Sequence, residues 1–165
     1  MDRTARGSHT VRAVVLATAL TVVAVASDVQ PRPPGARAAC PVCGMFVAPH
    51  PAWTAQIVFA DGSAVFFDGC KDLFKFLTDR ERYATLDRPA GAVIAAVFVT
   101  GYYDQKPISA REAFFVSGGD VLGPMGAELI PLANRDEADE FMRDHRGTRV
   151  LRFDEINTTV VSTLD

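Results

Sequence analysis

Two short apolar segments separated by a turn signal open the folded part of the chain. Residues 55–59 and 64–67 are rich in β-forming residues, and Asp61-Gly62 lies between them. An Asp-Gly pair between apolar runs is a strong local signal for a tight β-hairpin, because glycine accepts the positive φ that such turns require. The pattern therefore predicts two antiparallel strands joined at this pair.

A helix and a third strand are expected to follow this hairpin. Asp68 stands where a helix cap is expected, and the next residues place one apolar face at helical spacing, formed by Cys70, Leu73, Phe74 and Leu77. A nearly continuous apolar run at residues 93–99 is typical of a central strand. The first half of the domain, about residues 40–100, is thus predicted to have the order ββαβ.

The second half, about residues 101–165, repeats this order with little sequence identity. Strands are predicted at residues 112–117, 128–132 and 148–153. Asn134, with Glu137 three residues later, is typical of a helix start, and Gly147 is expected to end that helix. The predicted fold class is α+β, with two similar ββαβ halves that form one compact domain over residues 40–165.

The first 26 residues have the pattern of an export signal. Basic residues lead into an uncharged stretch at 13–26, which ends in the cleavage-type sequence Ala24-Val25-Ala26. The stretch is shorter than the roughly 20 residues of a comfortable membrane span, so cleavage near Ser27 is expected. The alternatives are an uncleaved N-terminal anchor and a lipoprotein modified at Cys40, which follows Ala38-Ala39, although Arg37 and the distance from the apolar stretch argue against lipidation. Residues 27–39 are rich in proline and predict a flexible linker. We therefore expect a periplasmic or cell-envelope protein, tethered to the membrane if the segment is retained.

Composition and charge narrow the function. The 165 residues are 48% hydrophobic and 22% charged, which is typical of a folded globular protein. The net charge is −3 and no block of five basic residues occurs, so nucleic acid is not an expected partner. Serine-hydrolase, zinc-protease and nucleotide-binding motifs are absent from the sequence, which argues against an enzyme.

The candidate chemistry lies in the segment Cys40-Pro41-Val42-Cys43-Gly44-Met45. Two cysteines spaced C-x-x-C can bind one metal ion or form a disulfide, and Gly44 permits a tight turn that brings the Met45 thioether alongside. Thiolates and thioethers are soft donors, which suit Cu(I) better than Zn(II). The three cysteines are an odd number, so at least one thiol lies outside any internal disulfide.

Other interpretations of these residues stay open. A thiol-disulfide oxidoreductase would use Cys40 and Cys43, but in thioredoxin-like enzymes C-x-x-C begins a helix, whereas the glycine and prolines that follow here favour a loop. A zinc site needs four good donors, and the chain offers three cysteines and His50. Cys70 is expected to be buried rather than metal-bound, and Asp68 is expected to be a cap rather than a ligand.

Several segments resemble one family. They are CPVCGMFV, FFDGCKDLFKF, VTGYYDQKPISAREAFFVSG, GPMGAELIPL and EFMRDHRGTRVLRFDEI. Over about residues 40–156 these are similar to the nitrous oxide reductase accessory protein NosL family of copper-binding cell-envelope proteins. The resemblance implies a fold of two ββαβ halves and a Cu(I) site at the Cys-Gly-Met motif, which corresponds here to Cys43 and Met45. Met125 lies in another family motif, and its role as a ligand is our own inference.

The expected function is that of a Cu(I)-binding metallochaperone. It would accept copper from a donor and deliver it to a copper enzyme, which the family name implies to be nitrous oxide reductase, an enzyme of denitrification. The candidate metal ligands are Cys43, Met45, Met125 and Cys40, with His50 as the next choice if Met125 is not a ligand. The alternative function is the thiol-disulfide oxidoreductase.

Overall fold

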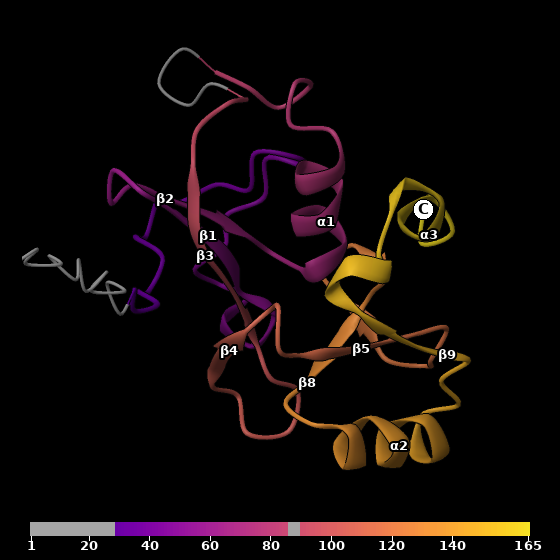
Figure 1. Cartoon of the computed structure of the whole chain (residues 1–165). Helices are drawn as coiled ribbons and strands as arrows, with labels where there is room; N and C mark the ends of the chain where they lie inside the picture. Colours follow the sequence, from indigo (N-terminus) through magenta and orange to yellow (C-terminus); the bar gives the residue numbers. More distant parts are fainter. Residues whose placement is uncertain (1–28, 86–89) are drawn as a thin grey trace, which may run out of the picture.

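Two larger antiparallel sheets, a two-stranded hairpin and helices packed against the sheets make up the described part of the fold (Figure 1). The computed structural model describes residues 29–85 and 90–165, so the predicted signal peptide or anchor at 1–26 lies outside the described residues. The mixture of sheets and helices confirms the predicted α+β class. In the part of the chain that is described, no helix is both long and apolar enough to span a bilayer.

The first sheet has the strand order β2-β1-β3-β4. Its strands are β1 (Ala55–Phe59), β2 (Ala64–Phe67), β3 (Ile94–Thr100) and β4 (Pro107–Ser109). The predicted hairpin between β1 and β2 is confirmed, with Ala55 opposite Phe67 and Val58 opposite Ala64. Gly62 adopts a φ of +82°, a conformation that glycine accepts without strain.

The second sheet has the strand order β8-β5-β9. It consists of β5 (Phe114–Ser117), β8 (Ile130–Leu132) and β9 (Arg149–Arg152), and a separate two-stranded hairpin is formed by β6 (Leu122–Gly123) and β7 (Gly126–Ala127). The first strand of each predicted half lies between the other two strands of that half: β1 lies between β2 and β3, and β5 lies between β8 and β9. The similarity of the two halves stays a prediction, which superposing them would test.

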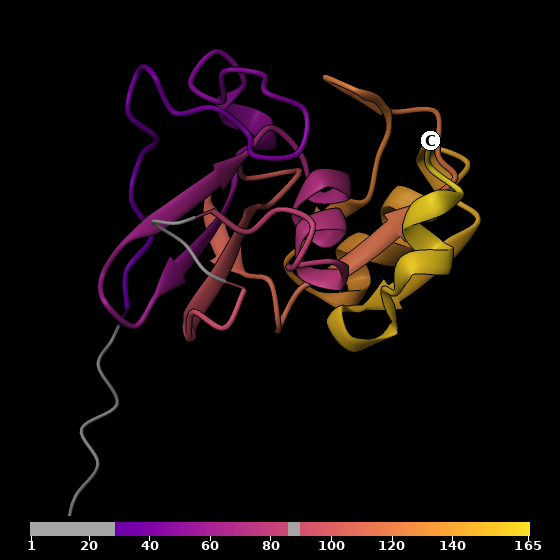
Figure 2. The same ribbon diagram turned by 90° about the horizontal axis from the view of Figure 1, so that it is seen from above.

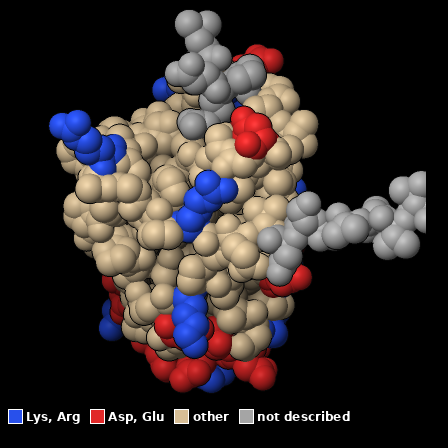
Figure 3. All heavy atoms as spheres, turned by 90° about the vertical axis from the view of Figure 1, so that its left-hand side faces the viewer, with Lys and Arg blue, Asp and Glu red and all other residues tan. Residues whose placement is uncertain are grey.

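Helix α2 (Arg135–Asp144) follows β8. Its predicted start is confirmed, because the Asn134 side chain accepts a hydrogen bond from the Glu137 backbone N–H at 2.9 Å. The helix ends before the expected Gly147, because Arg146 adopts a left-handed φ of +56°. Figure 3 shows charged side chains of both signs gathered at the lower end of the molecule, which is where α2 lies in Figure 1.

Helix α1 (Cys70–Thr78) lies between the first sheet and the C-terminal helix α3 (Thr158–Ser162), as Figure 2 shows. It also contacts the second sheet, since the rings of Phe74 and Phe115 meet edge to face with centroids 5.2 Å apart. The other face of the second sheet packs on α2 through Val116, Ile130 and Phe141. The main core is therefore shared by both sheets, with α1 in contact with each.

The expected cap of α1 is wrong. The N-cap is Gly69, which has no side chain, and Asp68 points its carboxylate at Cys43 instead. The backbone N–H of Lys71 in the first helical turn is bonded by the Glu128 side chain, which comes from the second half of the chain. A residue so distant in sequence supplies the acceptor that a local cap would otherwise provide, and this leaves Asp68 available to the thiols.

Part of the predicted linker makes specific contacts. The Arg32 backbone N–H donates to Gln56 Oε1 at 3.0 Å, and Gln56 Nε2 donates to the Arg32 carbonyl at 3.1 Å. Ala39 forms an isolated antiparallel bridge with Phe46. The segment before Cys40 is thus held against β1 by Arg32. The Ala39–Phe46 bridge closes the loop of residues 40–45, which we call the cysteine loop.

Candidate metal centre

The cysteine loop is a tight turn closed by backbone hydrogen bonds. The Cys40 N–H donates to the Met45 carbonyl at 2.8 Å, and the Gly44 N–H donates to the Cys40 carbonyl at 2.9 Å. Gly44 has a φ of +79°, which a residue with a side chain rarely adopts. The C-x-x-C segment is therefore a loop, as predicted, and it does not begin a helix.

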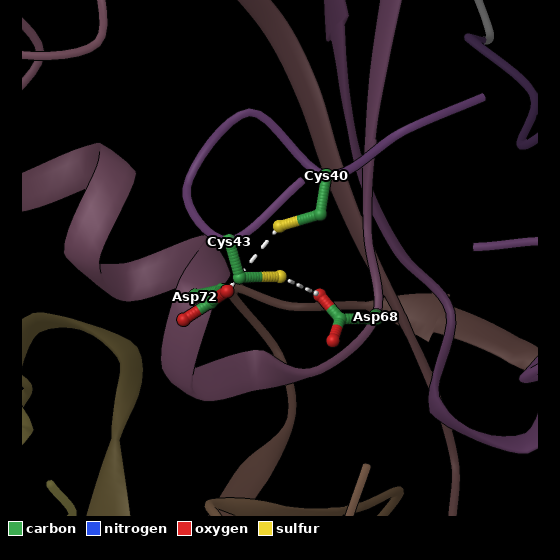
Figure 4. A group of neighbouring side chains, drawn as sticks. All are labelled: Cys40, Cys43, Asp68 and Asp72. Carbon is green, nitrogen blue, oxygen red and sulfur yellow. Dashed lines mark hydrogen bonds between the residues drawn. The ribbon is translucent and has the colours of Figure 1, made fainter. Parts of the chain in front are cut away.

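Two thiols and two carboxylates meet at the start of α1. One donor atom from each of Cys40, Cys43, Asp68 and Asp72 lies within 4.8 Å of the others. The Cys40 thiol donates to Asp72 Oδ2 at 3.3 Å, and the Cys43 thiol donates to Asp68 Oδ1 at 3.2 Å (Figure 4). The loop supplies the sulfurs, the segment after β2 supplies Asp68, and the first turn of α1 supplies Asp72.

The two thiols differ in exposure. Cys40 is 1% exposed, whereas Cys43 is exposed to solvent. Burial raises the pKa of Cys43 to about 11, and the neighbouring carboxylates raise it further. Burial also raises the pKa of Cys40 far above its usual range, with the Asp68 and Asp72 carboxylates acting in the same direction. Both thiols therefore carry protons at neutral pH, and a metal ion that binds to sulfur must displace them.

One carboxylate oxygen of Asp68 accepts no hydrogen bond from the described residues. This oxygen is Oδ2, and the Asp68 side chain is buried. A buried carboxylate oxygen without a partner is costly. This oxygen is therefore available to accept a further hydrogen bond or to contact a cation at the site.

A cleft of about 740 Å³ opens beside Cys43. Its wall also includes Asp72 and Lys71 of α1, together with Met125 in the turn between β6 and β7. The fold thus brings Met125 to the same cleft as Cys43, although the two residues are 82 positions apart in the sequence. Cys40 lies behind Cys43 in the core.

The other candidate residues have different surroundings. Met45 is half-buried in the cysteine loop. His50 precedes the short 3-10 helix η1 (Pro51–Trp53), where its carbonyl accepts from the Trp53 N–H at 3.0 Å, and it is not a member of the Cys-Asp cluster. Cys70 is buried at the start of α1 and also lies outside that cluster, which agrees with the expected core position.

Sequence reasoning missed both carboxylates. Asp68 was assigned to the helix cap, and Asp72 was not singled out. Asp68 precedes the extended N-cap Gly69 and Asp72 lies in the first turn of α1, so helical spacing alone does not place the two carboxylates together. What could not be inferred locally is that Glu128, from elsewhere in the chain, accepts the Lys71 N–H in the first turn of α1.

The donor set determines which metals fit. The two sulfurs suit Cu(I), which favours thiolate and thioether ligands in low coordination numbers. All four side chains together also supply the four sulfur and oxygen donors that a Zn(II) site requires. The Met125 thioether in the adjoining cleft favours the softer ion, because thioethers are weak ligands for Zn(II).

Comparison with known proteins gives consistent matches. Residues 31–161 match the model of the NosL family. The copper-binding lipoprotein NosL of Stutzerimonas stutzeri is 29% identical over 127 residues, and the match spans 74% of this chain and 63% of that protein. The crystal structure of the copper chaperone NosL from Shewanella denitrificans has a TM-score of 0.65 and 26% identity, covering 79% of this chain and 97% of that one. The solution structure of apo-NosL from Achromobacter cycloclastes has a TM-score of 0.45 and 28% identity, covering 65% and 87%.

These relatives are named as copper-binding protein and copper chaperone, not as enzymes. The name lipoprotein implies a cell-envelope location for the relative from Stutzerimonas stutzeri. The fold observed here is that of the Shewanella denitrificans structure, and the family match extends over most of the described residues. The chain therefore belongs to the NosL family.

Proposed function

We propose that this protein is a Cu(I) chaperone of the cell envelope. The observation that carries the proposal is the exposed Cys43 thiol at a cleft that Met125 also lines, with the second thiol of Cys40 behind it. These donors are soft and approach from two separate parts of the fold. The copper binding named for the relatives supports the same assignment.

Cys43 is the principal ligand in this proposal. It is the exposed thiol, so it can meet an incoming copper ion and later an acceptor's ligand. Cys40, Met45 and Met125 complete the ligand set. Asp68 and Asp72 act as hydrogen-bond acceptors that hold the protonated thiols, since carboxylate oxygen is a poor ligand for Cu(I).

Copper would be transferred by stepwise ligand exchange. A docked acceptor replaces the Cys43 and thioether ligands one at a time, so the ion is never released into solution. The partners are a copper donor and a copper-enzyme acceptor, and the family resemblance points to nitrous oxide reductase as the acceptor. The cell envelope is where both partners would be met, with or without a membrane tether at the N-terminus.

The thiol-disulfide oxidoreductase is a weaker assignment. Such enzymes need a reactive thiolate, which usually requires a lowered cysteine pKa. Here burial raises the pKa of Cys43 to about 11, and the C-x-x-C segment does not itself begin a helix as it does in thioredoxin-like enzymes. The Cys43 thiol is therefore poorly suited to disulfide exchange.

Cysteine variants of the purified protein test the proposal. Under anaerobic conditions, with a competing Cu(I) chelator, Cys43→Ser should abolish tight binding and Cys40→Ser should weaken it in part. Cys70→Ala is the matched control, because Cys70 is a free cysteine outside the cluster, and it should keep wild-type affinity. Intact Cu(I) binding in Cys43→Ser would contradict the proposal. A catalysed insulin-reduction rate that is lost in either loop variant would support the oxidoreductase.

A further inference from the structure

The hairpin that carries Met125 has little support from other strands. β6 and β7 form a two-stranded sheet of their own, with Gly123 paired to Gly126 across the turn. The Met125 side chain is 46% exposed. A two-residue pair of strands is marginal in water without outside contacts. Groups beyond the hairpin must therefore fix it if Met125 is to occupy a defined place at the cleft.

Lys71 of α1 reaches the turn of this hairpin. Its ammonium group donates to the Met125 carbonyl at 2.9 Å and to the Leu164 carbonyl at 3.1 Å, and the Asp165 carboxylate lies 4.0 Å away. The Lys71 side chain is 5% exposed. A buried ammonium is costly unless it is hydrogen-bonded, so these acceptors restrict where the Met125 backbone can lie.

Glu128 follows the same hairpin and holds the start of α1. Its Oε1 accepts from the Leu129 N–H at 2.8 Å and, in a short contact, from the Lys71 N–H. A Cβ atom at Gly69 would come within 2.0 Å of Glu128 Oε2, so the missing side chain makes room for the carboxyl group. Lys71 is therefore bound to the hairpin region twice, through its side chain and through its backbone.

We propose that Lys71 and Glu128 are positioning residues, which hold the Met125 thioether at the cleft beside Cys43 by tying its hairpin to α1. The same helix places Asp72 against the Cys40 thiol. Helix α1 thus sets the position of the Met125 thioether relative to the Cys40 and Cys43 thiols. This inference rests on the proposed function, because the position of Met125 matters for copper only if its sulfur binds the ion.

Lys71→Met tests the hydrogen bond from the Lys71 ammonium group to the Met125 carbonyl, because it removes that group and keeps an unbranched side chain. Cu(I) affinity should fall by about 10- to 100-fold, the usual effect of losing a group that orients a metal ligand. In a Met125→Leu background, the same replacement should change the affinity by less than about twofold, because Lys71 acts through Met125. Lys71→Arg should recover part of the affinity.

Lys75→Met is the matched control. Lys75 lies one turn further along α1 and lines the same cleft. It pairs with Asp165 and, at 4.0 Å, with Asp72, but not with the hairpin. Its replacement removes the same charge and should leave Cu(I) affinity near the wild-type value. An equal loss in Lys71→Met and Lys75→Met would overturn the proposal in favour of a general charge effect.

The Met125 ε-methyl resonance gives a readout that does not depend on copper. In the metal-free protein, Lys71→Met and Glu128→Leu should move it toward the position of a free methionine, while Glu128→Gln, which keeps an acceptor, should not. The Met142 methyl, packed against the α2 core, reports that the fold is intact.

An unmoved Met125 methyl in folded Lys71→Met and Glu128→Leu overturns the positioning role. If the methyl moves but Met125→Leu keeps full Cu(I) affinity, positioning is supported and the ligand role of Met125 fails. The two proposals therefore fail in different experiments. Because Glu128→Leu leaves the Lys71 ammonium and its Met125 acceptor in place, a Lys71→Met variant that does not fold still leaves the inference testable.

Discussion

Cys40 and Cys43 show how two identical side chains in one loop acquire different roles. Cys40 is enclosed by the core and bonded to Asp72, while Cys43 is exposed at the cleft and bonded to Asp68. Burial raises the pKa of both thiols, so both are protonated before a metal arrives. In the proposed Cu(I) site, the exposed thiol would exchange ligands with a partner, and the buried thiol would retain the ion during that exchange.

At Met125, replacing sulfur with carbon separates ligation from packing. Met125→Leu keeps an apolar side chain of similar volume at a half-exposed position, so the free energy of unfolding should change by less than about 1.5 kcal/mol. Cu(I) affinity should fall, and X-ray absorption should show one sulfur fewer around copper. An unchanged first shell in this variant would mean that Met125 is not a ligand.

Glu128 should make stability depend on pH in an identifiable direction. Burial raises the pKa of its carboxyl group from 4.5 to about 8 in the folded protein, although backbone hydrogen bonds from Leu129 and Lys71 act in the opposite direction. The folded state therefore binds a proton that the unfolded chain releases near pH 4.5. The resulting stabilisation is complete below that pH and is lost as the pH rises to about 8.

Urea unfolding of the wild type and Glu128→Gln across this range measures that contribution. The amide cannot titrate, so the stability of the wild type relative to the variant should decline between about pH 4.5 and pH 8. A stability difference that stays constant with pH would show that the Glu128 pKa is the same in the folded and unfolded states.

Among the elements, α1 depends on contacts that its own sequence does not contain. Its N-cap has no side chain, and its first turn is bonded by Glu128. Asp68, freed from capping, contacts Cys43. The start of this helix is therefore where the second half of the chain acts on the candidate metal centre.

Gly69→Ala tests this arrangement. The added methyl group would meet the Glu128 carboxyl, which is buried and hydrogen-bonded and so cannot move without cost. We expect a loss of about 1–3 kcal/mol in the free energy of unfolding, the usual range for overpacking. Gly91→Ala is the control, because a Cβ there meets nothing within 4 Å. Equal stabilities of the two variants in urea unfolding would refute the close contact at Gly69.

Elements set by nearby residues could be predicted from the sequence, and those set by distant contacts could not. The β1–β2 hairpin follows from Asp61-Gly62, and the start of α2 follows from Asn134 with Glu137, because each signal acts within four residues. The Cys-Gly-Met loop was identified for the same reason. The capping by Glu128 and the burial of Lys71 were missed, because both depend on packing between residues more than fifty positions apart.

In the whole molecule, the candidate centre lies where the two sheets meet at α1. The cysteine loop packs against the first sheet, and the Met125 hairpin belongs to the second half of the chain. Phe74 joins α1 to Phe115 of the second sheet. A copper site built from Cys43 and Met125 would therefore require both halves to be folded and in contact.

The most direct test of this account is metal competition on the purified protein under anaerobic, reducing conditions. Equimolar Cu(I) and Zn(II) are offered together, and bound metal is counted after buffer exchange. The soft donor set predicts about one Cu(I) per chain, with sulfur dominating its first shell in X-ray absorption. Stoichiometric Zn(II) that survives competition with Cu(I), with oxygen ligands in its first shell, would contradict the account and assign the site to the two thiols and the carboxylates of Asp68 and Asp72.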